Sequence, residues 1–133
     1  MLFKEIFGPI AQRVDALRPE LDALALDLHA HPELSFEEVR SSKEVAEFLR
    51  RRGFAVEPVA DVPTAFRAAR SFGGDRPRVV FMAEYDALPG VGHACGHNLI
   101  AGASVGGAAA LADWMEAGGV SGEVVCLGTP AEE

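Results

Sequence analysis

Two short apolar segments constrain the fold of this chain more than any other feature. Residues 78–83 and 123–128 are continuous runs rich in valine, phenylalanine and leucine, a pattern typical of strands buried on both faces of a parallel sheet. A long Gly- and Ala-rich stretch at 98–117 lies between them. It is predicted to form a helix that is capped by Asn98 and stopped by glycines, and its small residues predict close approach to the sheet. Because strand–helix–strand order is typical of α/β proteins, we expect an α/β fold with a mostly parallel central sheet flanked by helices.

The remaining segments predict further helices and strands around this unit. An apolar stripe with steps of three and four residues covers 3–28 and predicts an amphipathic helix. Pro19 inside it predicts either a kink or a new helix start. Ser35, followed by acidic residues, predicts the N-cap of a second helix. Alternating patterns predict strands at 54–59 and 64–72.

The loop between the two apolar segments carries the chemistry-bearing residues. Its sequence at 90–98, GVGHACGHN, places one thiol and two imidazoles within five residues. Cys95 and His97 are two positions apart, so their side chains leave an extended or turning backbone on the same side. Thiolate and imidazole are ligands that suit zinc and neighbouring first-row metals. A buried structural cysteine, or a Cys95 nucleophile with His97 or His93 as its base, remain alternatives.

Acidic residues follow both apolar segments. Glu84 and Asp86 come after the first, and Glu132 and Glu133 come after the second. Because the carboxyl ends of parallel strands line the ligand crevice of an open sheet, we expect these acids to meet the thiol and imidazoles. Adjacent glutamates diverge, so one can bind a metal while the other reaches a different point. A metal together with a free carboxylate suits the hydrolysis of an amide.

The pair His29 and His31 offers a second possible site. In barrel amidohydrolases an H-x-H pair supplies two metal ligands at the end of a strand. Here the preceding residues have helical rather than strand periodicity. We therefore favour a structural role at a helix C-terminus, where imidazoles meet the negative end of the dipole.

Composition and charge limit the partners of the chain. Its 133 residues allow one domain and one core. A formal charge of −8 disfavours nucleic acid, whose binding depends on Lys and Arg. We find no signal-peptide pattern and no apolar run long enough to span a bilayer. Two cysteines do not make a disulfide framework, so we expect a cytoplasmic protein with no membrane partner.

Three motifs resemble one known family. LHAHPELSFEE at 28–38, AEYDALPGVGHACGHN at 83–98 and GTPAEE at 128–133 resemble, in order and spacing, the aminoacylase and hippurate hydrolase family of co-catalytic metallopeptidases. They look most similar to the branch of p-aminobenzoyl-glutamate hydrolase and dipeptide amidohydrolases. The resemblance implies a zinc-peptidase-like catalytic domain that hydrolyses an amide of an N-acyl amino acid, aminobenzoyl-glutamate or dipeptide through a metal-bound water.

The resemblance also implies roles for individual residues. Cys95 would be a thiolate bridging two divalent ions, which could be zinc, manganese or cobalt. His97 would bind one of them, and Glu133 would be a further ligand. Glu132 would be the general base on the bridging water and thus the catalytic residue.

A departure from the family pattern concerns the first acidic pair. Many relatives have His-x-Asp here, and that histidine binds metal, whereas this chain has Glu84-Tyr85-Asp86. We expect His97 to supply the missing imidazole and Asp86 to orient a ligand. Glu84 has no assigned role, and His93 is expected beside the ligands rather than on the metals.

The family pattern further requires two histidines and a lid domain after the glutamate pair. We therefore expect residues 1–133 to be the N-terminal portion of a catalytic domain, with the lid and dimerisation domain and the remaining catalytic segment absent. The second metal site would be incomplete and the fragment inactive alone, while the full-length protein would be a homodimer. A cysteine hydrolase using Cys95, and a non-catalytic truncated domain that acts only in association, are the competing hypotheses.

Overall fold

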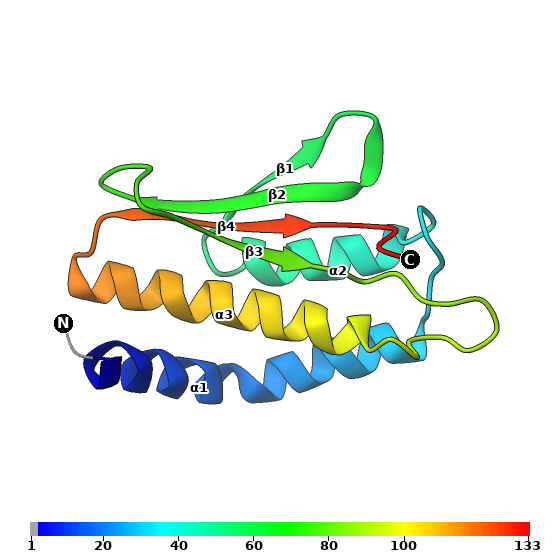
Figure 1. Ribbon diagram of the computed structural model, residues 1–133, viewed down its shortest axis with the longest axis horizontal. Coiled ribbons are helices and arrows are strands. Elements are labelled where there is room, and N and C mark those ends of the chain that lie inside the picture. Colours follow the sequence, from blue (N-terminus) through cyan, green and yellow to red (C-terminus); the bar gives the residue numbers. More distant parts are fainter. Residues whose placement is uncertain (1–2) are drawn as a thin grey trace.

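Seven elements make up the part of the chain that the computed structural model describes, residues 3–133. The three helices lie on one face of a four-stranded sheet (Figure 1). In chain order the elements are α1 (Phe3–Ala30), α2 (Val39–Arg50), β1 (Ala55–Val59), β2 (Val62–Phe72), β3 (Arg78–Ala83), α3 (His97–Gly118) and β4 (Gly122–Gly128).

The sheet has the strand order β1-β2-β4-β3 and is mixed. Strands β3 and β4 are parallel and are connected by α3, as the two apolar segments predicted. The other two pairs, β1 with β2 and β2 with β4, are antiparallel. The α/β class is confirmed, but the parallel arrangement is limited to β3 and β4. Strands β1 and β2 form a hairpin across a short turn, a connection that is possible only between antiparallel strands.

The helices form two layers beneath the sheet. Helices α2 and α3 contact the strands, whereas α1 packs mainly against α3 (Figure 1). The core lies between these layers and the inner face of β2 and β4. Its largest wholly buried apolar side chains are Tyr85, Phe48, Leu28, Leu49, Val45, Val105 and Val124.

Small residues allow α3 to approach elements on two sides. A Cβ added to Gly106 would lie 2.7 Å from Leu21 Cδ1 of α1, and one added to Gly107 would lie 2.8 Å from Phe81 Cε1 of β3. Gly102 also faces α1. We expected close approach to the sheet, and this holds for Gly107. Gly102 and Gly106 instead allow close approach of α1. The glycines that lower the helix propensity of α3 therefore allow helix–helix contact as well.

Two predicted N-caps were wrong, and one of the two alternatives at Pro19 is excluded. Helix α1 is continuous for 28 residues and contains Pro19, so no new helix begins there. Helix α2 begins at Val39, and the Ser35 hydroxyl donates to Asp86 rather than capping the helix. Helix α3 follows Gly96 in the left-handed conformation, and the Asn98 side chain donates to the Ala25 carbonyl oxygen. In both cases the side chain predicted to cap the helix donates instead to an acceptor on a distant segment.

Strand β3 is more exposed than its sequence predicted. Strand β4 lies between two neighbours and is buried along nearly its whole length. Strand β3 lies at the sheet edge, and Val80 and Met82 are 48% and 56% exposed. Among the described residues, no helix covers the outer face on which these two side chains lie. Among residues 3–133, no helix combines the length and apolar character needed to cross a membrane.

Candidate metal centre

His97 lies at the point where the ends of β3 and β4 meet the start of α3. It is the first residue of α3 and is 3% exposed. Its Nδ1 atom lies 2.8 Å from the carbonyl oxygen of Asp86 and 3.1 Å from Oδ1 of the same residue. Since only acceptors face Nδ1, this nitrogen carries a proton and donates it to Asp86. The ring is thereby oriented with Nε2 toward the other acids.

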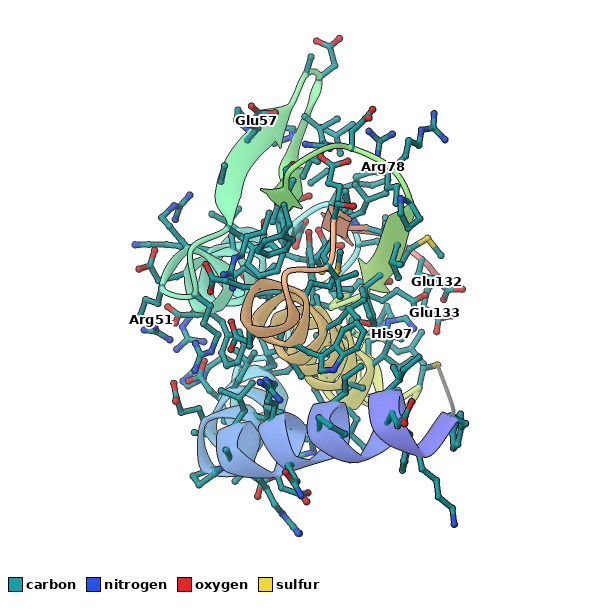
Figure 2. All side chains as sticks on the ribbon, turned by 90° about the vertical axis from the view of Figure 1, so that its left-hand side faces the viewer. Arg51, Glu57, Arg78, His97, Glu132 and Glu133 are labelled. Atoms are coloured by element: carbon teal, nitrogen blue, oxygen red, sulfur yellow. The ribbon has the colours of Figure 1, made fainter. Side chains whose placement is uncertain are left out.

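Three carboxylates surround the other ring nitrogen. His97 Nε2 lies 3.3 Å from Glu132 Oε2, 3.4 Å from Glu84 Oε2 and 3.7 Å from Glu133 Oε1. One donor atom each from Glu84, His97 and Glu132 lies within 4.8 Å of the others. Figure 2 shows His97 beside Glu132 and Glu133, far from Glu57 on β1. Several negative oxygens around one imidazole nitrogen favour a positive charge between them, and carboxylate and imidazole donors fit a divalent cation.

The electrostatics of His97 follow from these neighbours. Burial opposes protonation of the ring, but the hydrogen bond to the Asp86 carbonyl oxygen favours it. The negative charges of Asp86, Glu84 and Glu132 act in the same direction, and together they raise the pKa of His97. The site therefore attracts positive charge, whether it is a proton or a metal ion.

Cys95 lies beside the glutamates. A hydrogen bond to Glu133 raises the pKa of its thiol, and burial and the charges of Glu133 and Glu132 raise it further. The same acids that would help to hold a cation thus oppose formation of a free thiolate. This disfavours Cys95 as an unassisted nucleophile, because catalytic cysteines need electropositive surroundings that lower the pKa.

Asp86 contacts both the His97 ring and the backbone of Glu133. It is 1% exposed, and its Oδ2 atom accepts the backbone N–H of Glu133 at 3.0 Å. Burial raises the pKa of Asp86, but the hydrogen bonds from the backbone of Glu133 and Glu132 outweigh it, so the net shift is downward. An ionised Asp86 therefore links the orientation of the His97 ring to that of the Glu133 backbone.

The other histidines lie outside this group of donors. Burial, followed by the charges of His97 and His29, lowers the pKa of His93. His29 and His31 are exposed at the end of α1, and His31 Nδ1 lies 2.9 Å from the Asp27 carbonyl oxygen. None of these three residues belongs to the group formed by Glu84, His97 and Glu132.

Two residues of the centre were not assigned from the sequence. Glu84, for which no role was given, contributes an oxygen to the donor group. Its position two residues before Asp86, on the same face of the chain, was the available signal. Glu38 is wholly buried and its carboxylate accepts the backbone N–H of Ala131; no local pattern indicated this contact.

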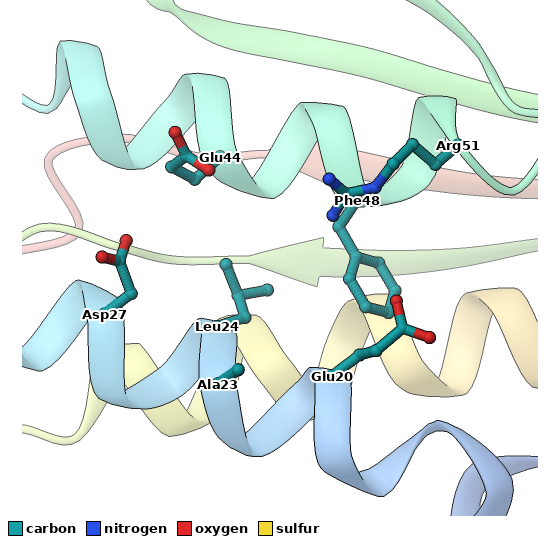
Figure 3. A pocket seen from close by; sticks show the side chains of 7 residues that line it. All are labelled: Glu20, Ala23, Leu24, Asp27, Glu44, Phe48 and Arg51. Carbon is teal, nitrogen blue, oxygen red and sulfur yellow. The ribbon is translucent and has the colours of Figure 1, made fainter.

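A separate hollow between α1 and α2 has a volume of about 230 Å³ (Figure 3). Two of the acids that line it are already paired, Glu20 with Arg52 and Asp27 with Arg40. The His97 cluster contributes none of its lining residues. We therefore place the candidate site at His97.

Comparisons with known proteins agree with this placement. No family model matches the chain. It is 42% identical over 134 residues to the Xaa-Arg dipeptidase of Mus musculus, covering 92% of this chain and 31% of the relative. It is 35% identical over 148 residues to a p-aminobenzoyl-glutamate hydrolase chain of Escherichia coli strain K12, covering 98% of this chain and 30% of the relative. The structure of a Bacillus subtilis protein, described as a dinuclear metal-binding peptidase of the M20 family, has a TM-score of 0.74 and 28% identity, covering 89% of this chain and 36% of that one.

The chain is a homologue of the M20 peptidases. This confirms the resemblance that the three sequence motifs indicated. The chain spans about a third of the length of the curated M20-like relatives it matches.

Proposed function

We propose that residues 1–133 form the N-terminal part of the catalytic domain of a metal-dependent amidohydrolase. Its substrate would be a small molecule with an amide bond, such as an N-acyl amino acid, aminobenzoyl-glutamate or a dipeptide. The observation that carries the proposal is the buried His97 ring, whose Nε2 atom is faced by three carboxylates and whose Nδ1 atom is fixed by Asp86. The homology to M20 peptidases supports the reaction class.

In this proposal the chain's own residues divide the work between binding and proton transfer. Cys95, His97 and Glu133 would hold two divalent cations, with Glu84 beside them. Zinc, manganese and cobalt all suit a set of thiolate, imidazole and carboxylate donors. The chemistry that such cations supply when bound is polarisation of water and of the substrate carbonyl group.

Glu132 is the proposed catalytic base. Its side chain is 50% exposed, compared with 30% for Glu133, so it is the more accessible of the two to a substrate. In the proposed reaction Glu132 accepts the proton of the attacking water and passes it to the leaving amine. Asp86 keeps the His97 ring and the Glu133 backbone in place while this occurs.

The test uses the full-length protein that contains this segment. Chelation should abolish amide hydrolysis, and zinc, manganese or cobalt should restore it. Glu132→Gln should retain bound metal but lose turnover by about 10²–10⁴-fold, the usual contribution of a general base. Glu57→Gln, a change at an exposed residue of β1 far from the cluster, is the matched control and should keep both properties (Figure 2).

Two results would contradict the proposal. Hydrolysis that survives thorough metal removal would exclude metal-dependent chemistry. Inactivation by one equivalent of a thiol reagent, with the metal content intact, would favour the cysteine hydrolase instead. We expect the 133-residue chain alone to be inactive, since it spans about a third of the relatives.

A further inference from the structure

Glu38 is a buried acid that the proposed reaction does not use. It lies at the N-cap of α2 and is 0% exposed. Its Oε1 atom accepts the backbone N–H of Ala131 at 2.9 Å, a contact between residues 93 positions apart, and its Oε2 atom has no hydrogen-bond partner among residues 3–133. Burying a carboxylate is costly, so a fully buried one with a single long-range contact requires a reason.

The partner of Glu38 adopts an unusual backbone conformation. Ala131 has φ of +55°, the left-handed region that is unfavourable for a residue with a Cβ atom. Two residues further along the chain, the N–H of Glu133 donates to Asp86. Two buried carboxylates, from the start of α2 and the end of β3, thus hold amides on either side of Glu132. Figure 1 shows this C-terminal end beside the first turn of α2.

The neighbouring acid Glu33 has a different task. Its carboxylate accepts the backbone N–H groups of Arg40 at 3.0 Å and Ser41 at 2.6 Å, together with the Ser41 hydroxyl. These bonds fasten the first turn of α2 from outside the helix, and none of them reaches the segment 129–133. Glu33 therefore stabilises the start of α2, whereas the Glu38 carboxylate makes no capping bond there and instead holds the segment 129–133.

We propose that Glu38 is a positioning residue of the metal centre. By holding the N–H of Ala131 it fixes the left-handed turn, and this turn directs the side chains of Glu132 and Glu133 toward His97. The inference rests on the metal centre proposed above, and it adds a residue far from the metal ligands in the sequence.

Cobalt(II) binding to the full-length protein that contains this segment tests the proposal. The wild-type spectrum should contain a thiolate-to-cobalt charge-transfer band from Cys95 and visible d–d bands. Glu38→Leu places an apolar side chain of similar size at this position and removes the acceptor. It should weaken cobalt binding by about 10–100-fold and alter the d–d bands, as changes behind metal ligands usually do. Glu38→Gln keeps an acceptor oxygen and should restore both the affinity and the spectrum.

Glu33→Leu is the matched control. It removes a half-buried acceptor that binds the first turn of α2, so it should lower the unfolding temperature while leaving the cobalt spectrum and affinity unchanged. If Glu33→Leu and Glu38→Leu reduce cobalt binding to the same extent, Glu38 acts only through helix stability and the proposal is overturned. A folded Glu38→Leu chain that binds cobalt like the wild type would overturn it as well.

A metal-free measurement separates this inference from the proposed function. In Glu38→Leu the amide protons of Ala131 and Glu133 should exchange faster with solvent and shift in the NMR spectrum. If the wild-type chain binds no cobalt but these amides respond, the metal centre fails while the positioning contact stands. If the amides keep their wild-type protection, the positioning role is wrong. Should Glu38→Leu not fold, Ala131→Pro removes the N–H donor and also the left-handed turn, because Pro cannot adopt the φ of +55°. It should weaken cobalt binding at least as much as Glu38→Leu.

Discussion

Gly128, the last residue of β4, provides a quantitative test of the packing next to the segment 129–133. A Cβ atom at this position would lie 2.7 Å from the Tyr85 hydroxyl oxygen and within 3.0 Å of the Phe66 ring. Phe66 is 4% exposed and Tyr85 is 0% exposed, and their rings are stacked with centroids 6.3 Å apart. The Tyr85 hydroxyl donates to the Thr64 carbonyl oxygen. Gly128→Ala must therefore displace at least one buried aromatic ring.

The magnitude follows from three contributions. Overpacking a closed core costs about 1–3 kcal/mol. Disturbing the hydrogen bond from Tyr85 to Thr64 costs about 0.5–1.5 kcal/mol. Replacing Gly by Ala within a strand recovers about 0.5–1 kcal/mol of backbone entropy. The expected net loss is about 0.5–4 kcal/mol, against the roughly 5–15 kcal/mol that stabilises a typical domain.

Urea unfolding of the wild type and the variant measures this loss. Gly74→Ala is the control, because a Cβ atom at Gly74 would meet nothing within 4 Å and should change stability by no more than about 0.5 kcal/mol. Phe66→Leu should relieve part of the overlap, so the double variant should lose less than the sum of the two single variants. If Gly128→Ala were as stable as Gly74→Ala, the described packing around Gly128 would be wrong.

Two further predictions concern stability. A hydrogen bond from Arg78 lowers the pKa of Glu123 despite burial, and Arg67 contributes in the same direction. Ionised Glu123 therefore stabilises the fold fully above its unfolded pKa of about 4.3. This stabilisation is lost as the pH falls through the lower pKa of the folded state. Wild-type urea midpoints should thus fall more steeply below about pH 4.3 than those of Glu123→Gln, and equal slopes would contradict the assignment. Phe36 is 70% exposed with φ of +63°, so Phe36→Gly should remove about 1–2 kcal/mol of left-handed strain and lose about 0.5–1 kcal/mol to chain entropy. A higher thermal unfolding temperature is expected, and a lower one would show that the Phe36 ring is stabilising.

The sequence predicted those features that depend on local pattern or on strand ends. The apolar segments identified β3 and β4, and their connection by α3 identified the parallel pair. Because both strands end at one edge of the sheet, the order of residues along the chain was enough to place the acids after them near Cys95 and His97. The assignment of Glu132 as base and Glu133 as ligand stays a prediction.

Features that depend on contacts between distant segments could not be predicted in the same way. The direction of β2 is set by its neighbours, not by its own alternation of residues. Ser35 and Asn98 have ordinary capping side chains, yet each bonds to an acceptor on another segment. The burial of Glu38 follows from its meeting with Ala131, 93 residues away, and an acid in a helix-start motif is ordinarily exposed.

The exposed edge of the sheet has a consequence for handling this polypeptide. Among the described residues, no strand pairs with the outer edge of β3, and Arg78, its one charged residue, is already engaged by Glu123. Natural edge strands usually carry charges or prolines that discourage joining to another chain, and β3 has neither along 79–83. In concentrated solution, an extended segment of another polypeptide chain can therefore pair with this edge as a fifth strand.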